Sequence, residues 1–550
     1  MKQKSLLLSL ILSLAALCYA ADNDARYFEI SKNLDIFNSL FRELDLFYVD
    51  TIDTKTLVRT AIDNMLEELD PYTTYISESE IKDLELMTTG EYGGVGAIIG
   101  KKGDSTVIME LYENMPAHKN GLQTGDVIVE IDGQRMTAAK TTTEISEMLK
   151  GEPGKPVSVT VKRTGEKKEI KKDIIREKIQ IDAVSYYNIY DNVAYIYLSG
   201  FTDKATNELK KAFTALKAKN NLEGLVIDLR GNAGGIIDEA VNICNLFLPK
   251  GTEVVSTRGK DKQWDKTYKT LREPLDVNIP IVVLVNEMSA SAAEIVAGAL
   301  QDLDRAVVIG NRTFGKGLVQ TTRPLDFNGF LKVTTAKYYT PSGRCIQAID
   351  YEHKDEEGQA NRIPDSLTHE FKTTHGRIVR DGGGITPDIT IDEPETLNIT
   401  YKLVTDHLIF DYVTDYVHRH PQIVSLDEFV FSDEEYDNFK QYLKSKKFTY
   451  TLKSSEILQK LKDIIKLEGY GELSEAEFSA LEEKLKPNTD KDLDTFRDSV
   501  KKLISTEIAK RYYFQKGEIR EALKSDDGLK KAIELLKNKE EYDKLLRHVK

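Results

Sequence analysis

Residues 281–320 read IVVLVNEMSASAAEIVAGALQDLDRAVVIGNRTFGKGLVQ, and this stretch decides the fold of the chain around it. It opens with a continuous apolar run at 281–285, which predicts a strand buried on both faces of a parallel sheet. A turn rich in serine and alanine follows at 289–293, and apolar residues at helical spacing predict a helix over 295–303. A second apolar run at 306–309 predicts another strand. The alternation of strands and helices predicts a sheet that is covered by helices.

Two side chains in this stretch have an unusual setting. Ser291 stands where the predicted strand turns into the helix, close to the unpaired N–H groups of the first helical turn. Such N–H groups can stabilise a developing oxyanion. Lys316 stands between Gly315 and Gly317 in an apolar context, where a lysine is unusual unless it has a function. A serine, a base and oxyanion donors are the components of an acyl-transfer site.

The turn SASAAE and the later FGKGLVQ resemble the C-terminal processing peptidases, the tail-specific serine proteases. The resemblance extends over roughly residues 34–391. It implies that Ser291 is the nucleophile and that Lys316, 25 positions later, is its general base. It also implies orienting roles for Glu294 and Gln320, and a crotonase-like α/β catalytic core.

A lysine acts as a base only when it is neutral, so its pKa must fall about three units below the free value of ~10.4. Burial away from anions can supply that change, and a serine–lysine pair is an established variant of the catalytic triad. Ser289 is the alternative nucleophile, although the family register favours Ser291. A histidine triad is the competing arrangement, and the nearest histidines are His353 and His369, which have no motif around them.

A glycine-rich turn follows another predicted strand. Residues 224–230, GLVIDLR, predict a buried strand, and GNAGG follows at 231–235. In the family that the chain resembles, this turn faces the serine, and a glycine amide joins the amide after the serine as an oxyanion donor. The resemblance therefore implies Gly234 or Gly235 together with Ala292, and it leaves the choice between the two glycines open.

The stretch PAHKNGLQTGDVIVEIDG, within residues 90–172, closely resembles a PDZ domain. Such a domain binds an extended peptide by adding it to the edge of a sheet, while backbone amides hold the terminal carboxylate. The matching glycine-rich turn consists of Gly93, Gly94, Val95 and Gly96. A phosphate-binding loop is excluded because no Lys-Ser/Thr follows and the next predicted element is a strand.

These patterns predict a multidomain α+β protein. Helical periodicity indicates an N-terminal helical region over 21–89, which ends at the turn LDPYT. The PDZ domain (90–172) is inserted before the catalytic core (173–395), and helix formers and charged residues indicate a helical C-terminal domain (396–550). Within the core, 251–280 and 351–384 lack strong periodicity and are predicted as loops.

Residues 1–20 have the pattern of a signal peptide. Lys2 and Lys4 precede an apolar run at 6–17, and small residues at 18 and 20 suit cleavage after Ala20. The run is too short to span a bilayer, which takes about 20 residues. Lipid attachment at Cys18 is disfavoured because the preceding Leu17 is bulky. We therefore expect an exported protein of the periplasm or cell envelope.

Composition and cysteine spacing exclude other classes. The net charge of −14 argues against nucleic acid as a partner. Cys244 and Cys345 have neither a CxxC spacing nor a nearby histidine, so we expect no metal and no cofactor, while a disulfide between them stays open. The expected partners are protein or peptide substrates with accessible C-termini. Peripheral membrane association and a homo-oligomer are both compatible with the sequence.

The expected function is that of an exported serine endopeptidase. It would bind C-terminal tails through the PDZ domain and cleave through Ser291 and Lys316 by way of an acyl-enzyme. The alternative is a non-catalytic peptide-binding scaffold of the same fold, and the presence of both side chains argues against it.

Overall fold

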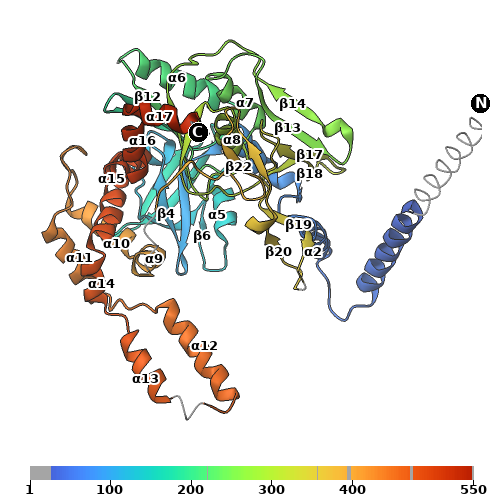
Figure 1. Ribbon diagram of the computed structural model, residues 1–550. Coiled ribbons are helices and arrows are strands. Elements are labelled where there is room, and N and C mark those ends of the chain that lie inside the picture. Colours follow the sequence, from blue (N-terminus) through green and yellow to red (C-terminus); the bar gives the residue numbers. More distant parts are fainter. Residues whose placement is uncertain (1–25, 220, 356, 393–397, 471–474, 548–550) are drawn as a thin grey trace, which may run out of the picture. The chain divides into compact units, whose positions relative to one another are not determined.

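The computed structural model describes residues 26–219, 221–355, 357–392, 398–470 and 475–547 (Figure 1). The predicted signal peptide, including Cys18 and the cleavage site after Ala20, lies outside the described residues. The chain divides into two compact units, and the first comprises residues 1–77 with 322–333. The second comprises residues 78–321 with 334–550. No helix among the described residues has the length and apolar character to cross a membrane.

The first unit contains a helix over residues 26–47 and helix α2 (Thr54–Glu67), as the N-terminal periodicity predicts. The turn LDPYT follows α2, and the carboxylate of Asp70 accepts hydrogen bonds from the N–H groups of Tyr72 and Thr73, both at 2.8 Å. This side chain replaces the helical hydrogen bonds that the turn forgoes. The short strand β1 (Thr74–Ile76) then pairs with residues 330–332 of β18 (Phe330–Tyr339).

The central sheet of the second unit has six strands in the order β10-β11-β12-β15-β16-β23. They are β10 (Val184–Tyr190), β11 (Val193–Leu198), β12 (Gly224–Asp228), β15 (Ile281–Val285), β16 (Ala306–Gly310) and β23 (Ile389–Thr390). All run parallel except β10. The strands predicted from the apolar runs are confirmed. Because β12 and β15 are parallel neighbours, the turns that follow them lie at the same edge of the sheet.

Helices cover both faces of this sheet, which explains why its strands are apolar at consecutive positions. On one face α6 (Ala205–Lys217), α7 (Ile237–Asn245) and α8 (Ala292–Asp302) share an apolar core with the sheet. On the other face the last two helices, α16 (Asp527–Lys537) and α17 (Lys539–Leu546), pack against alternate side chains of the same strands. Figure 1 shows both helices beside the sheet near β12. The C-terminal segment therefore completes the core of the sheet.

The stretches predicted as loops contain strands, and that prediction is wrong. Strands β13 (Glu253–Gly259) and β14 (Lys266–Lys269) form a hairpin within 251–280, and β13 also pairs with β18. β17 (Leu318–Pro324) pairs with β18 as well. Within 349–380 lie the short strands β19 (Ile349–Lys354), β20 (Ala360–Arg362), β21 (Glu370–Lys372) and β22 (Ile378–Arg380). Several of these strands have three residues, which is too few to produce a recognisable alternation.

A β-rich module follows α3 (Ile81–Thr89), as the sequence predicts. It begins and ends on a ribbon of β2 (Glu91–Gly94) paired with β9 (Glu177–Gln180). Its sheet consists of β3 (Ala97–Lys102), β4 (Ser105–Leu111), β5 (Val127–Ile131), β7 (Pro156–Lys162) and β8 (Ile170–Ile175) in that order, with β6 (Gln134–Arg135) beside β5. The helices are α4 (Pro116–Lys119) and α5 (Thr142–Leu149). Strand β3 lies at an edge of this sheet.

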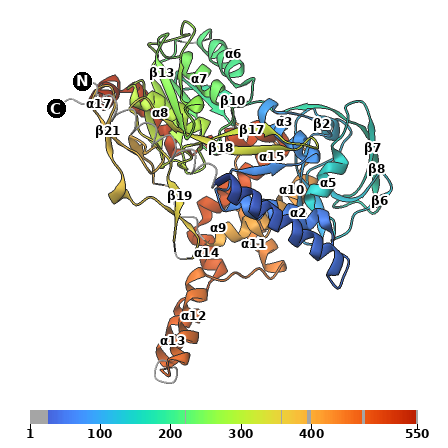
Figure 2. The same cartoon turned by 90° about the vertical axis from the view of Figure 1, so that its right-hand side faces the viewer.

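Helices form the remainder of the chain. They are α9 (Asn398–Thr405), α10 (Leu408–Arg419), α11 (Asp433–Ser445), α12 (Lys453–Leu467), α13 (Glu475–Lys484), α14 (Thr489–Thr495) and α15 (Arg497–Leu523). Most of them share one apolar core, whereas Figure 2 shows α12 and α13 extending from it as a pair. Helix α15 is kinked at Phe514, whose ring lies edge-on to His118 of the β-rich module, with centroids 4.8 Å apart.

Candidate active site

Ser291 occupies the sharp turn between β15 and α8, at the edge of the sheet where the parallel strands end. Its φ of 57° and ψ of −116° lie outside the regions that residues with a side chain ordinarily adopt. Strain of this kind persists only where the surrounding structure enforces it, and it is frequent at functional sites. Ser291 is half-buried and directly precedes Ala292, the first residue of α8.

One buried carboxylate connects the serine turn to the lysine loop. Oε2 of Glu294 accepts hydrogen bonds from the backbone N–H groups of Ser291 and Lys316, each at 2.9 Å. Oε1 accepts from the N–H of Gly315 at 2.8 Å and from the hydroxyl of Thr313 at 2.6 Å. Burial raises the pKa of Glu294 to about 7, although these four donors favour its ionised form. Glu294 therefore holds the two loops against each other.

Contacts on the opposite side of the lysine loop also constrain its backbone. The N–H of Gly317 donates to Oε1 of Gln347, and the N–H of Ala348 donates to the carbonyl of Gly315, both at 2.8 Å. Gly315 has a φ of 89°, and a Cβ there would lie 2.3 Å from the Cβ of Ala348. A Cβ at Gly317 would lie 2.8 Å from the N atom of Gln347. Glycine is therefore required on both sides of Lys316.

The glycine-rich turn after β12 lies directly against Ser291. A Cβ at Gly234 would lie 2.8 Å from the Cβ of Ser291 and 2.9 Å from the N atom of Ala292. A side chain at this position would therefore push the two turns apart. The predicted proximity of the GNAGG turn and the serine turn is confirmed.

Asn232 organises this turn. It is fully buried, its Oδ1 accepts from the N–H of Gly234 at 2.8 Å, and its carbonyl accepts from the N–H of Ala290 at 2.9 Å. The N–H of Gly234 is thus used within the turn. By contrast, no hydrogen bond from the N–H of Gly235 or of Ala292 is found in the described part of the chain. These two N–H groups remain available to a ligand at the serine.

The β-rich module has a groove of about 410 Å³ between β3 and α5. Its lining is mainly apolar and includes Val95, Ala97, Ile99 and Leu149. The backbone N–H groups of Val95 and Gly96 at its end have no acceptor among the described residues. Gly93 and Gly94, in contrast, lie within β2, opposite Lys178 and Glu177 of β9. The groove thus combines an edge strand, an apolar lining and unpaired N–H groups.

Comparison with known proteins agrees with this geometry. A model described as peptidase family S41 matches residues 192–354, a PDZ domain model matches 107–163, and a model described as "Probable PDZ-protease, C-terminal helical domain" matches 399–536. The carboxy-terminal-processing protease of Bartonella bacilliformis is 39% identical over 321 residues, which cover 58% of this chain and 73% of that protein. The chain belongs to peptidase family S41. It is a relative of the carboxy-terminal-processing serine proteases.

Other relatives cover more of this S41 peptidase. A "Probable CtpA-like serine protease" of Staphylococcus aureus is 35% identical over 385 residues, which cover 68% of the chain and 69% of that protein. The solved structure of a photosystem II D1 C-terminal processing protease is 28% identical and has a TM-score of 0.37. The match covers 65% of this chain and 92% of the chain in that structure. The S41 core, the PDZ domain and the C-terminal helical domain are all present in this peptidase.

Ser289, the other serine of the turn, has a different environment from Ser291. It is fully buried, its hydroxyl donates to the carbonyl of Leu229 at 2.8 Å, and it accepts from the N–H of Asn286 at 3.0 Å. Those bonds tie the serine turn to the end of β12. The hydroxyl of Ser289 is thus engaged in holding the turn of the S41 peptidase.

Gln320 lies on β17, and its side chain donates to the hydroxyl of Thr334 on β18 at 3.1 Å. The histidines of the competing triad, His353 and His369, are each 78% exposed and pair with Asp350 and Asp381. No hydrogen bond joins either histidine to Ser291 among the residues described. The arrangement therefore gives no support to a histidine triad in this peptidase.

Cysteines and acidic groups add no further chemistry to the site. Cys244 and Cys345 are free thiols, so no disulfide joins them, and Cys244 is buried in α7. Burial raises the pKa of both thiols. In the described ranges, no group of three or more His, Cys, Asp or Glu residues has the geometry to hold a metal ion.

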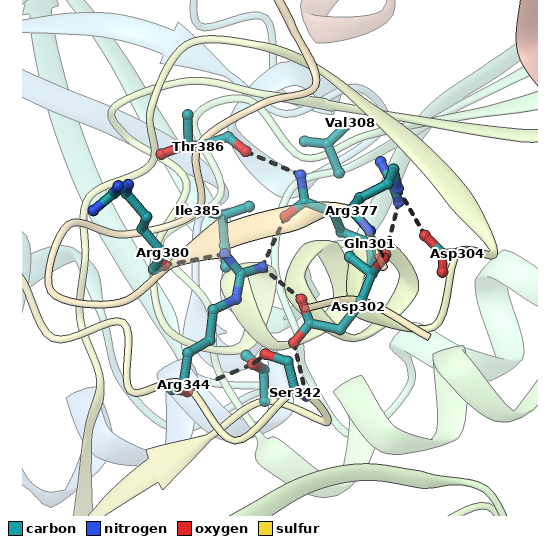
Figure 3. Close-up of polar contacts among 12 residues, drawn as sticks. Gln301, Asp302, Asp304, Val308, Ser342, Arg344, Arg377, Arg380, Ile385 and Thr386 are labelled. Atoms are coloured by element: carbon teal, nitrogen blue, oxygen red, sulfur yellow. Dashed lines mark hydrogen bonds and ion pairs between the residues drawn. The ribbon is translucent and has the colours of Figure 1, made fainter. Parts of the chain in front are cut away.

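Two buried arginines hold the far end of α8 by donating hydrogen bonds to several acceptors (Figure 3). The sequence had indicated no role for these residues. Arg344 is 1% exposed and donates to Asp302 at 2.7 Å and to the side chain of Gln301 at 2.8 Å. Arg377 donates to the carbonyl of Gln301 at 2.8 Å and to Asp304 at 2.7 Å. Buried charges of this kind are retained only when they are paired. Both ends of the helix that follows Ser291 are therefore held in place.

Asn232 and Thr313 were also missed, although both hold the loops of the site. The only signal in the sequence was their position, since Asn232 lies within the glycine-rich turn at 231–235 and Thr313 lies shortly before Gly315. A polar residue in such a turn can hydrogen-bond the backbone around it.

Proposed function

We propose that this S41 peptidase cleaves peptide bonds through a dyad of Ser291 and Lys316. The observation that carries the proposal is the carboxylate of Glu294, which binds the backbone of both residues and holds the serine turn beside the lysine loop. No catalytic histidine is required, because a neutral lysine can take the proton of a serine hydroxyl.

In the first half of the reaction, Lys316 takes the proton from the hydroxyl of Ser291 as its oxygen attacks the scissile carbonyl carbon. The N–H groups of Gly235 and Ala292 stabilise the oxyanion, because the N–H of Gly234 is already bound to Asn232. The C–N bond then breaks, and Lys316 returns the proton to the leaving amine. Water hydrolyses the resulting ester of Ser291, with Lys316 again acting as base, and the free serine is restored.

Substrate selection is assigned to the PDZ domain. The groove between β3 and α5 has an unpaired strand edge to accept a peptide strand, and the N–H groups of Val95 and Gly96 can receive a terminal carboxylate. We propose that the substrates are proteins or peptides with accessible, apolar C-terminal ends.

The test compares single substitutions in the full chain. Ser291→Ala and Lys316→Ala should each abolish cleavage of an unfolded protein substrate. The double variant should lose no more activity than either single variant, because the pair acts as a unit. Lys337→Ala is the matched control, since Lys337 is an exposed lysine on β18. Cleavage by the Ser291→Ala variant at the rate of the unmodified enzyme would contradict the proposed dyad of Ser291 and Lys316.

We also propose that residues 1–20 direct export and that the mature enzyme acts in the periplasm or cell envelope. The support is the basic start, the apolar run and the small residues before the cleavage position. Sequencing the N-terminus of the protein recovered from cells tests the proposal, with Ala21 expected as the first residue. A mature protein that still begins at Met1 would contradict it.

A further inference from the structure

We propose that Lys150 provides the positive charge that binds the terminal carboxylate of the substrate in the PDZ groove. This inference rests on the proposed tail recognition and adds a residue to it. Lys150 directly follows α5 as its C-cap and lines the groove together with Val95, Ala97 and Leu149. Its side chain is 17% exposed, so its charge lies close to the groove rather than in bulk solvent.

Two contacts place Lys150 beside the loop whose N–H groups are unpaired. A Cβ at Gly94 would lie 3.8 Å from the Cα of Lys150. The next residue, Gly151, donates its N–H to the carbonyl of Gly93 at 3.0 Å. The end of α5 therefore runs next to Gly93 and Gly94, directly before Val95 and Gly96, whose N–H groups have no acceptor in the described chain.

A carboxylate in this position needs a cation nearby. Moving a charged group into a partly buried, apolar groove is costly unless an opposite charge and hydrogen bonds compensate. Backbone N–H groups supply the hydrogen bonds, and charge-assisted bonds of this kind are the stronger ones. Among the described residues that line the groove, Lys150 is the only cation and Glu147 the only anion.

Glu147 is the partner that a substrate carboxylate would replace. Its Oε1 accepts from Nζ of Lys150 at 2.9 Å, and it is more exposed than the lysine, at 44%. An incoming carboxylate therefore exchanges one anionic partner of Lys150 for another, and Glu147 moves into solvent. Glu147 thus competes with the tail, and it disfavours weakly bound acidic ligands.

The experiment measures peptide binding to the full chain carrying Ser291→Ala, so that the probe is not cleaved. The probes are one fluorescent peptide with an apolar last residue and a free carboxylate, and the same peptide with an amidated C-terminus. Lys150→Met should weaken binding of the free acid about tenfold, the usual effect of losing one bond to a charged group, and leave the amide unchanged. Lys150→Arg should retain the preference, and Glu147→Gln should strengthen binding of the acid.

Lys119→Met is the matched control, because Lys119 is an exposed lysine of the same domain that pairs with Glu177 outside the groove. A parent chain that binds acid and amide equally would overturn tail recognition itself, and the role of Lys150 with it. A parent that prefers the acid, together with a Lys150→Met variant that keeps the full preference, would overturn only the role of Lys150. Equal loss of both peptides in Lys150→Met would show a structural effect and would also overturn it.

Discussion

Ser291 and Lys316, 25 positions apart in the sequence, donate their backbone N–H groups to the same oxygen atom, Oε2 of Glu294, each at 2.9 Å. Both of these donors are backbone N–H groups. A fully buried carboxylate with four donors is a rigid link, because each lost bond would leave a buried polar group unpaired.

The first prediction concerns this link. Glu294→Gln places an amide N–H₂ where two of the four N–H and O–H donors now point, so the two loops must separate. We expect kcat/KM to fall by at least about a hundredfold, the size of effect that follows a misplacement of about 1 Å. Steady-state cleavage of a peptide substrate measures it. Glu287→Gln, an exposed residue of the same turn, is the control, and equal activity of both variants would contradict the link.

The second prediction concerns pH. Burial raises the pKa of Glu294 from its ordinary value of 4.5 to about 7 in the folded chain. A carboxyl group with a raised folded pKa contributes stability that is complete below its unfolded pKa and is lost as the pH rises through about 7. We therefore expect the free energy of unfolding to fall between about pH 4.5 and about pH 7, and then to level off, by an amount that Glu294→Gln removes.

Activity should change in the opposite direction, with its midpoint near the folded pKa of about 7. Only the ionised carboxylate accepts all four donors, so cleavage should rise as Glu294 ionises. Urea unfolding and initial rates, both measured as a function of pH, test the pair of statements. A free energy of unfolding that increases with pH in the unmodified enzyme but not in Glu294→Gln would contradict the assignment.

The third prediction concerns the space between the two turns. Gly234→Ala introduces a Cβ that would lie 2.8 Å from the Cβ of Ser291, and it should lower kcat by about a hundredfold or more. The control is Gly251→Ala, where φ is 87°, similar to the 98° of Gly234, but no atom lies within 4 Å of the added Cβ. The control carries the backbone strain without the clash. Equal losses of kcat in both variants would show that the effect comes from backbone strain alone and not from the clash with Ser291.

The fourth prediction concerns the C-terminal segment. The guanidinium of Arg230, next to the glycine-rich turn, binds Asp228 and also Asp526 at 2.8 Å, and Asp526 caps α16. Asp526→Ala should destabilise the protein by about 1–2 kcal/mol through the lost cap alone, with more from the lost ion pair. Denaturant unfolding measures the change.

Asp527→Ala is the matched control for this substitution, because Asp527 is 76% exposed and pairs only with the neighbouring Lys530 among the described residues. Its effect should stay within about 0.5 kcal/mol, as is usual for a surface residue. Equal destabilisation by both substitutions would mean that the contact between Arg230 and Asp526 contributes nothing to the core.

Local patterns were sufficient for the parts of the fold that depend on local physics. The run at 281–285 predicts a strand because consecutive apolar residues belong to a sheet buried on both faces, and β15 has these bounds. The glycines beside Lys316 were visible in the sequence, and the structure explains them by a positive φ and by contacts with Gln347 and Ala348. The loop predictions at 251–280 and 351–384 failed because the strands in them are mostly polar and some have only three residues.

Choices between neighbouring residues needed the tertiary structure. Gly234 and Gly235 are equivalent in the sequence, and only the side chain of Asn232, bonded to the N–H of Gly234, distinguishes them. Ser289 differs from Ser291 because the end of β12 reaches its hydroxyl.

The same holds for long-range packing. An apolar stripe shows that a helix is buried but not against what, so the packing of α16 and α17 on the central sheet could not be derived from their periodicity. The sequence by itself determined the apolar strands of the central sheet, the helix after Ser291 and the glycine-flanked lysine, because these follow from the residues nearest in the chain. The tertiary structure alone decided which donors remain unpaired, because hydrogen bonds between distant segments use up the others.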